Sequence, residues 1–278
     1  MNLELGSLTG VGGTRIHTIH AAAEAPRADA VIVHGYAEHS ARYGAVMAAL
    51  LDKGFAVHAL DHRGHGRSGD KLGLIDHWES LLRDLEAFLA SVRVGKPDDS
   101  KLVMVGHSMG ALAIAHVLER HNVQIDAAVL SAIPLVPTVE VSPVLLSVSS
   151  IVARLAPTVP VADLDSSHVS RDPEVVAAYD NDPFVYHGKF MARTGDELLK
   201  ATDWSKDHLG DIDQPALFMT GTADKITSPD GTDLAFEGAS SADKEVKHYD
   251  GLYHEIFNEP EQETTIADAV DFLDSRTG

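Results

Sequence analysis

Short apolar runs alternate with amphipathic segments along the first half of the chain, and this alternation restricts the fold more than any other feature. The runs lie at residues 30–33, 55–60 and 102–105, and each is followed by turn residues. Apolar runs of this length, bounded by turns, are typical of strands buried on both faces of a sheet. Two further runs of the same kind occur at residues 127–130 and 216–219.

The segments between these runs have the spacing of amphipathic helices. Residues 78–94 place apolar side chains at intervals of three and four, which predicts a helix with one buried face. Residues 42–53 end at Gly54, a residue type suited to the position after a helix, and residues 109–120 follow Ser108 directly. This alternation predicts an α/β fold, with a mostly parallel sheet flanked by helices.

The alternation stops after Ser131, and the next seventy or so residues contain no further buried apolar run. Within them, residues 142–156 predict a helix that begins at Pro143 and is apolar around most of its circumference. That helix is too short to cross a bilayer, so its apolar surface must meet protein, substrate or lipid. We expect a single domain over residues 1–278, with a core of residues 1–132 and 205–278 and a helical cap insertion over residues 133–204.

The composition removes several classes of function. Cysteine is absent, which excludes disulfide frameworks, thiolate metal sites and a cysteine nucleophile. The net charge is −20, and no cluster of Lys and Arg offers the cationic surface that a nucleic-acid partner requires.

The N-terminal residues lack the basic and apolar regions of a signal peptide, and no stretch approaches the ~20 apolar residues of a membrane span. We therefore expect a cytoplasmic protein.

The pentapeptide Gly106-His107-Ser108-Met109-Gly110 fits the pattern G-x-S-x-G. It follows a predicted strand and precedes a predicted helix, which is the context that a nucleophile elbow requires. Glycine permits the sharp turn because a Cβ at either flanking position would crowd the neighbouring strand or helix. Ser108 would then project from the carboxyl end of the sheet, beside a helix N-terminus that favours negative charge.

A serine hydroxyl at its ordinary pKa is a poor nucleophile, so a base and an orienting acid must follow. In folds of this kind, their order along the chain is Ser, Asp or Glu, and then His. Asp224 follows the run at residues 216–219, and His254 follows a strand-like segment at residues 245–249. We predict that His254 accepts the proton of Ser108 and that Asp224 fixes the tautomer of the imidazole.

Two backbone N–H groups are expected to bind the oxyanion of the tetrahedral intermediate. One belongs to Met109, directly after the candidate nucleophile, and the other to Tyr36 in the segment that follows the first buried run. The side chain of Tyr36 is not needed for this role.

Two other segments invite a ligand-binding interpretation. Asp61, His62 and His65 resemble a set of metal ligands, but Arg63 and Arg67 in the same loop would repel a cation and suit a braced turn. The glycine-rich residues 10–13 lack the preceding buried strand of a phosphate-binding loop, and they predict a hairpin turn instead. We therefore expect no metal.

Four blocks of sequence form a set that is more specific than any one of them. Residues 34–43 fit the pattern HGxxEHxxRY, residues 61–68 fit DxRGHGxS, residues 106–110 read GHSMG, and residues 251–255 contain a closing G-x-Y-H. Together with the cap stretch Ser170-Arg171-Asp172-Pro173-Glu174, this set resembles bacterial monoacylglycerol lipases, in the serine aminopeptidase S33 or Hydrolase_4 group of the α/β-hydrolase superfamily. The resemblance runs nearly from end to end of the chain.

The resemblance implies an α/β-hydrolase core, a cap over the active site, and hydrolysis of a small lipid ester without a cofactor. The substrate would be a monoacylglycerol, cleaved to fatty acid and glycerol through an acyl-enzyme. Glu38 and Arg42 would lie near the glycerol end of the pocket, or would form an ion pair that braces the oxyanion loop. Ala111 and Phe257 depart from the pattern, because many relatives carry a second glycine at the first position and some carry a polar residue at the second.

A lipid substrate needs a long apolar channel, and the predicted helix at residues 142–156 offers one wall, unless it only packs on the core. The same apolar surface favours transient contact of the cap with a membrane or a micelle, and it leaves the oligomeric state open. The residues that we expect to contact the acyl chain are Ile133, Leu145, Leu146, Ile151 and Val152, with Met109 beside the nucleophile.

Three other functions compete with this one. A broad-specificity carboxylesterase or lysophospholipase would share the catalytic residues but would not select glycerol. An aminopeptidase would need a carboxylate that binds the free amino terminus of its substrate. A non-catalytic ligand-binding protein on the same fold would fail to react with a fluorophosphonate probe, whereas an intact Ser108 would be labelled.

Overall fold

The computed structural model describes residues 2–23, 25–97, 99–138 and 151–277. Within them, one eight-stranded sheet has the order β1-β2-β4-β3-β5-β6-β9-β10. All strands from β3 to β10 in this sheet run parallel, and β1 and β2 run antiparallel to their neighbours. The strands are β1 (Glu4–Thr9), β2 (Arg15–Ala21), β3 (Ala28–Val33), β4 (Phe55–Leu60), β5 (Leu102–His107), β6 (Ala127–Ser131), β9 (Ala216–Gly221) and β10 (Lys244–Tyr249).

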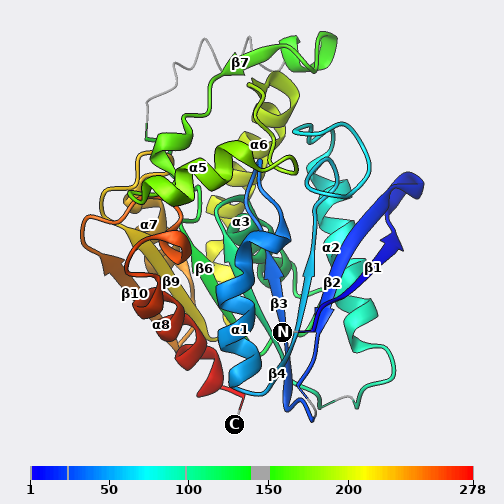
Figure 1. The fold of residues 1–278 in the computed structure, drawn as a ribbon, viewed down its shortest axis with the longest axis vertical. Helices are drawn as coiled ribbons and strands as arrows, with labels where there is room; N and C mark the ends of the chain where they lie inside the picture. The colour runs from blue at the N-terminus through cyan, green and yellow to red at the C-terminus, as the bar shows by residue number, and fades with distance from the viewer. Residues whose placement is uncertain (1, 24, 98, 139–150, 278) are drawn as a thin grey trace.

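Helices cover both faces of this sheet (Figure 1). On one face, α1 (Gly44–Asp52) and α8 (Gln262–Asp274) share a hydrophobic cluster with the buried side chains of β3, β4 and β5. On the other face, α2 (Trp78–Arg93), α3 (Met109–Arg120) and α7 (Pro229–Gly238) belong to a second cluster. Strands that are covered on both sides need apolar residues at every position, which explains the continuous runs in the sequence. The predicted α/β fold is confirmed.

Two turns of the chain contain glycines with a positive φ. Gly54 lies directly after the C-terminal end of α1 and has a φ of 82°, in the left-handed region that favours glycine, as its position predicted. Between β1 and β2, the chain turns through a short 3-10 helix, η1 (Val11–Gly13), in which Gly12 has a φ of 71°. The hairpin interpretation of this glycine-rich segment is therefore confirmed.

The segment after β6 rises above the carboxyl ends of the parallel strands (Figure 1). It includes a two-stranded antiparallel sheet of β7 (Pro160–Ala162) and β8 (Phe190–Met191), with η3 (Ser166–His168) and α5 (Pro173–Asn181) between them. The described end of the predicted helix over residues 142–156 is helical at residues 151–155, and residues 139–150 lie outside the described part of the chain. Among the described residues, no helix has the length and apolar character needed to cross a membrane.

The C-terminal end of the cap differs from the expected boundary between residues 204 and 205. This boundary falls inside α6 (Ala192–His208), a continuous helix that packs against α3 of the core. The ring of His116 on α3 lies 2.9 Å, by its Nε2, from the carbonyl oxygen of Ala201 on α6. Ala201 and Ser205, on the two sides of the expected boundary, are both buried residues of this one helix, so α6 has no break between residues 204 and 205. The remaining short helices are η2 (Ser40–Tyr43), η4 (Leu209–Asp211) and η5 (Ile256–Asn258).

Candidate active site

Ser108 lies at a sharp turn between β5 and α3. Its backbone has a φ of 51° and a ψ of −119°, a combination that residues with a side chain rarely adopt and that is typical of strained functional sites. Two hydrogen bonds hold this turn: the N–H of Ser108 donates to the carbonyl of Ser131 at 2.8 Å, and its own carbonyl accepts from Leu112 at 3.1 Å. The strain is therefore maintained by the neighbouring strand and by the first turn of α3.

The two glycines that flank the turn are required by close packing. A Cβ on Gly106 would lie 2.6 Å from Cδ1 of Ile114 and 2.8 Å from the carbonyl oxygen of Gly110. A Cβ on Gly110 would lie 2.1 Å from the carbonyl oxygen of Val33, on the adjacent strand β3. The crowding that the G-x-S-x-G pattern predicted is confirmed at both positions.

Asp224 and His254 come together at the same edge of the sheet, on the loops after the paired strands β9 and β10. Nδ1 of His254 lies 2.7 Å from Oδ2 of Asp224, and both side chains are buried. Thr227 donates from its hydroxyl to Oδ2 of Asp224 at 2.9 Å and from its N–H to Oδ1 at 3.0 Å, and the N–H of Ile226 donates to Oδ1 at 2.8 Å. The carboxylate is thus oriented by three donors besides the imidazole.

The electrostatics of this pair favour the charged forms of both groups. Burial opposes ionisation of Asp224, but attraction to His254 and the hydrogen bonds together outweigh it, and the pKa of Asp224 is lowered. Burial likewise lowers the pKa of His254, but the Asp224 carboxylate outweighs it and the net result is a raised pKa. Since an ionised carboxylate only accepts, Nδ1 of His254 carries the hydrogen and Nε2 remains an acceptor. This is the tautomer that a general base for a serine needs.

His107 packs against His254, with 4.5 Å between the ring centroids. Burial, followed by repulsion from His254, lowers the pKa of His107 to about 4. Its Nδ1 lies 3.2 Å from the hydroxyl oxygen of Ser131 on β6. His107 is therefore neutral at physiological pH, and the elbow adds no second positive charge next to His254.

The loop after β3 approaches the elbow at Gly35, where a Cβ would lie only 3.3 Å from Cβ of Ser108. In the described part of the chain, the N–H groups of Tyr36 and Met109 donate to no protein acceptor. The side chain of Tyr36 is engaged elsewhere: its hydroxyl donates to the carbonyl of Gly73 at 2.8 Å, and its ring packs against Phe190 of the cap. The backbone and the side chain of Tyr36 thus serve different parts of the molecule.

Glu38 and Arg42 form part of a buried ion-pair network. The carboxylate of Glu38 accepts from the N–H of Gly35 at 2.6 Å, from the hydroxyl of Tyr43 at 2.7 Å and from Arg42 at 2.9 Å. Arg42 also donates a hydrogen bond from each of its two terminal nitrogens to the carboxylate of Glu255, at 2.5 and 2.7 Å. Burial opposes the charge of Glu255, but Arg42 outweighs it and the pKa of Glu255 is lowered. The network therefore ties the loop of Tyr36 to the residue directly after His254.

The turn over residues 61–68 is braced by its charged residues. The carboxylate of Asp61 accepts from the N–H of Ser40 at 2.9 Å and from the N–H of Arg67 at 2.8 Å. Arg63 donates to the carboxylate of Asp84 on α2 at 2.7 Å. His65 is fully buried, and desolvation lowers the pKa of its imidazole to about 3. Arg63 thus has the bracing role that the sequence predicted, whereas Arg67 contributes its backbone N–H and its guanidinium lies over the ring of Phe184.

Of the predicted acyl-chain residues, the structure describes Met109, Ile133, Ile151 and Val152. Ile133 is fully buried within the core cluster that α2 and α3 share, so its packing is that of the core. Ile151 is 61% exposed and Val152 is half-buried on the described end of the cap helix. Leu145 and Leu146 lie outside the described residues. Phe257 is buried against the α1 and α8 layer, where it contributes to the core.

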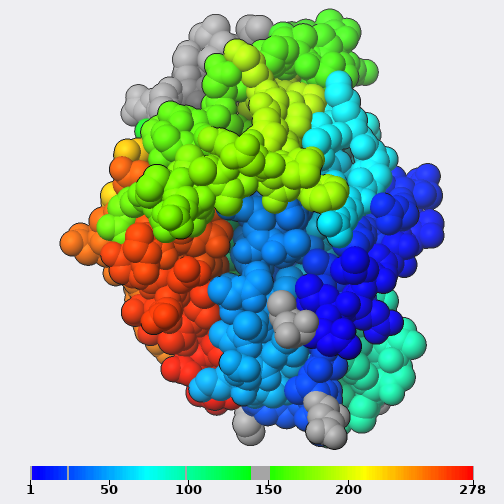
Figure 2. Space-filling model, in the orientation of Figure 1, coloured from blue at the N-terminus to red at the C-terminus, as the bar shows by residue number. Residues whose placement is uncertain are grey.

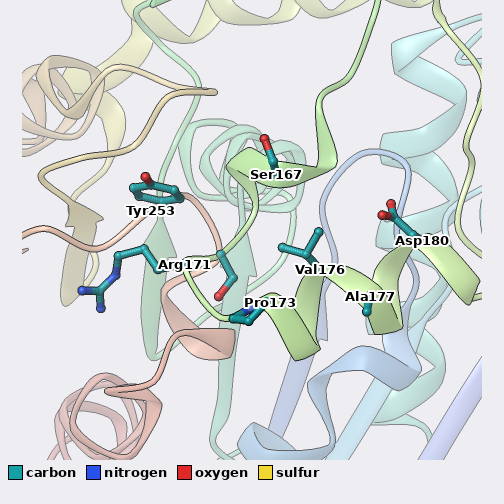
Figure 3. A pocket seen from close by; sticks show the side chains of 8 residues that line it. Ser167, Arg171, Pro173, Val176, Ala177, Asp180 and Tyr253 are labelled. Carbon is teal, nitrogen blue, oxygen red and sulfur yellow. The ribbon is translucent and has the colours of Figure 1, made fainter.

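A pocket of about 470 Å³ lies between the cap and the loop of His254 (Figure 3). Arg171 and Tyr253 lie next to each other at one end of it, and Val176 and Ala177 of α5 lie toward the other. None of Ser108, Asp224 and His254 lines it, so this pocket is adjacent to the candidate catalytic residues but separate from them. Its walls are formed by Ser167, Ser170, Arg171, Pro173, Val176, Ala177, Asp180 and Tyr253.

Sequence reasoning missed Thr227 and Glu255. Thr227 follows Asp224 by three residues, the spacing of a side chain–backbone turn, so a local signal for it exists. Glu255 gives no local signal, because its partner Arg42 lies 213 residues earlier in the chain.

Comparison with known proteins identifies the family. Residues 24–261 match Hydrolase_4, described as serine aminopeptidase, S33. The chain is 39% identical to a monoacylglycerol lipase of Mycolicibacterium smegmatis over 96% of this chain and 95% of the relative, and 30% identical to a phospholipase of Bacillus subtilis over 91% and 97%. The solved monoacylglycerol lipase of Paleococcus ferrophilus superposes with a TM-score of 0.83 at 30% identity, over 92% of this chain and 98% of that one. The chain therefore belongs to the Hydrolase_4, or serine aminopeptidase S33, family, as the sequence blocks indicated.

Proposed function

We propose that this chain hydrolyses monoacylglycerols to fatty acid and glycerol, through an acyl-enzyme on Ser108. The observation that carries the proposal is the buried pair of His254 and Asp224, 2.7 Å apart, at the edge of the sheet where the strained elbow presents Ser108. The 39% identity to the Mycolicibacterium monoacylglycerol lipase, over nearly the whole of both chains, supports the substrate class.

In the first half of the reaction, Oγ of Ser108 attacks the ester carbonyl while its proton moves to Nε2 of His254. The oxyanion forms near the N–H groups of Tyr36 and Met109, which have no protein acceptor in the described part of the chain. Donors held in place at this point are worth about 3 kcal/mol each in serine hydrolases. The tetrahedral intermediate then releases glycerol as the C–O bond breaks, and His254 returns the proton to the leaving oxygen.

In the second half, His254 takes a proton from water, and the resulting hydroxide attacks the acyl carbon. The second tetrahedral intermediate uses the same two N–H groups and releases the fatty acid, with the proton returned to Oγ of Ser108. Asp224 stabilises the imidazolium in both halves, in agreement with the raised pKa of His254.

Glu38 and Arg42 act in this proposal as braces for the oxyanion loop. The N–H of Gly35, directly before Tyr36, donates to Glu38, and the carboxylates on both sides of Arg42 occupy its guanidinium. These contacts favour the structural alternative over a direct contact with glycerol. The network would fix the position of the Tyr36 N–H relative to Ser108.

The cap is proposed to meet the lipid surface. Ile151, Leu155, Val159, Val161 and Leu164 are apolar and exposed, and all belong to the described part of the cap. Burying such side chains in a micelle or a membrane contributes about 25 cal/mol for each Å² removed from water. Transient docking through this surface would bring the active site to its substrate.

A broad esterase or lysophospholipase is the second candidate. The 30% identity to a Bacillus phospholipase over 97% of that protein favours it, since the same catalytic residues would cleave the acyl ester of a lysophospholipid.

Initial rates on a set of esters separate the two functions. The set contains monoacylglycerols of increasing chain length, the matched ethyl esters, a diacylglycerol and a lysophospholipid, with Ser108→Ala as the blank. A strong preference for monoacylglycerols over the other esters is expected. Equal rates on ethyl esters would reject glycerol selectivity and leave a general serine esterase.

A further inference from the structure

The loop that carries His254 is attached to the cap by two hydrogen bonds, one between backbone groups and one from a side-chain hydroxyl. The N–H of Glu255 donates to the carbonyl of Val169 at 2.8 Å, and the hydroxyl of Ser170 donates to the carbonyl of Asn258 at 3.0 Å. In the space-filling view, the base of the cap lies directly against the C-terminal segment (Figure 2). The backbone after His254 is therefore fixed from the cap side.

The backbone before His254 is fixed by one buried carboxylate. Oε1 of Glu259 accepts from the N–H of Tyr253 at 2.7 Å and from the N–H of Arg171 at 3.2 Å. Oε2 of the same side chain accepts from Nε of Arg171 at 3.0 Å. Glu259 is 0% exposed, so its charge depends on these three donors for compensation. One carboxylate thus connects the residue before His254 to the base of the cap.

Arg171 also contacts a second acid, Glu261, which differs from Glu259 in two respects. The side chain of Glu261 is half-exposed, and among the described residues the polar contact of its carboxylate is with the guanidinium of Arg171. Glu259 reaches both Arg171 and the N–H of Tyr253. The two acids share one arginine but only Glu259 touches the loop of His254, so they form a natural matched pair.

A base for a serine nucleophile must be placed accurately, since a misplacement of about 1 Å can cost roughly 100-fold in rate. Asp224 fixes one nitrogen of the imidazole, but the position of the whole ring also depends on the backbone that carries it. We propose that Glu259 is a positioning residue for His254, because it holds the Tyr253 N–H and links it to the cap through Arg171. This inference rests on the proposed role of His254 as the general base.

The length of the side chain and its charge can be tested separately. Glu259→Gln keeps the reach to Tyr253 but loses the charge, whereas Glu259→Asp keeps the charge but is one methylene too short to reach all its donors. A positioning role predicts that kcat on a soluble short-chain ester falls in the order wild type, Gln and then Asp. We expect a loss within about threefold for Gln and about 10- to 100-fold for Asp, at nearly constant KM.

The acid limb of the kcat/KM profile gives a second readout, because a ring displaced from Asp224 titrates at lower pH. Glu259→Asp should move this limb to lower pH, and Glu261→Gln, the matched control, should change neither kcat nor the limb. A charge-only structural role would be indicated if Asp retained activity while Gln lost it, or if the variants lowered the melting temperature without any change in kcat. Either result overturns the proposal.

Two further outcomes are distinguished in the same series. If Glu259→Asp does not fold, Arg171→Met tests the same link from the cap side. A loss of kcat at nearly constant KM, with the acid limb moved to lower pH, supports positioning, whereas wild-type kcat and limb reject it. If Ser108→Ala hydrolyses the same ester at the wild-type rate, the proposed function itself fails. A Ser108-dependent activity with no response to Glu259→Asp rejects only the present inference.

Discussion

The carboxyl edge of the sheet and the described part of the cap are built in opposite ways. At the carboxyl edge of the sheet, Asp224, His254 and Glu38 are buried. Both carboxylates accept hydrogen bonds from several donors, and Nδ1 of His254 is bonded to Asp224. On the described part of the cap, Leu155 and Val161 are apolar side chains that are 79% and 54% exposed.

The difference separates two tasks that a lipid hydrolase has to perform. Buried polar groups with complete hydrogen bonding hold one geometry, which acyl transfer requires. Exposed apolar side chains are not specific for one partner. Their contact with any apolar surface lowers the free energy, because it removes apolar area from water. We therefore expect substitutions at the sheet edge to change the chemistry on every ester, and substitutions on the cap to change only the handling of aggregated lipid.

The largest effect is expected for Ser108→Ala. Removing the hydroxyl leaves no nucleophile, and hydrolysis of any ester should fall by about 10⁴-fold or more. The backbone bonds to Ser131 and Leu112 do not involve this hydroxyl, so the melting temperature should stay close to that of the wild type. Initial rates and thermal denaturation check both statements. Substantial remaining activity would show that another group performs the chemistry.

The next largest effect is expected on stability, at Glu119 on α3. This buried carboxylate, unlike those at the sheet edge, lacks a hydrogen-bond donor for one of its oxygens among the described residues. One oxygen of its buried carboxylate accepts from Ser205, and the other has no partner among the described residues. Burial raises the pKa of Glu119 from about 4.5 to about 7, so folding becomes less favourable as the pH rises through this window. Glu119→Gln should remove the penalty and increase the free energy of unfolding at pH 8 by up to about 3 kcal/mol.

At pH 4.5 the same substitution should change stability little, because Glu119 is protonated in the folded protein there. Urea denaturation at the two pH values provides the comparison. The exposed Glu237 on α7 is the matched control, and Glu237→Gln should leave stability unchanged at both. An equal gain at pH 4.5 and pH 8 would contradict the assignment to the ionised carboxylate.

The cap gives a smaller and more selective effect. Replacing both Leu155 and Val161 by serine should lower the rate on long-chain substrate in micelles by about tenfold, since the lost apolar area weakens docking. The rate on a short, monomeric ester should change less than about twofold. Val94, at the end of α2, is similarly exposed and serves as the control in Val94→Ser. Equal losses on both kinds of substrate would place these cap residues in the catalytic machinery.

The smallest expected effect is on the pH at which kcat/KM of the wild type falls. Protonated His254 cannot accept the Ser108 proton, so kcat/KM must fall as the pH decreases through the pKa of His254. Because that pKa is raised, the midpoint of the acid limb should lie above 6.5. The cap variants should share this midpoint. A limb centred well below 6.5 would contradict the attraction between His254 and Asp224.

The sequence predicted most of what depends on neighbouring residues. The strand β4 at residues 55–60 and the helix α3 at residues 109–120 begin and end where the apolar runs and the turn after Ser108 indicated. These patterns are local consequences of burial on both faces of a sheet and of the tight turn at glycine. The loops after β9 and β10 could be placed at one edge because parallel neighbours end together.

Contacts between distant segments could not be predicted in this way. Glu255 and Glu259 are ordinary acids in the sequence, and only the folded chain shows that Arg42 and Arg171 neutralise them. The same limit applies to Ile133, which the sequence proposes for an acyl channel and the structure places in a buried cluster together with Met109. An apolar side chain is equally compatible with both environments until its neighbours are known.

The ion pair between Arg42 and Glu255 also has a consequence for the synthesis of the protein. Strands β3, β4 and β5 leave the ribosome early, and domains generally begin to fold while the chain is still growing. Glu255, which pairs with Arg42, is synthesised 213 residues later, directly after His254, the imidazole partner of Asp224. A growing chain that has not reached residue 254 therefore carries Ser108 without the imidazole that pairs with Asp224, and we expect such a chain to have no hydrolytic activity.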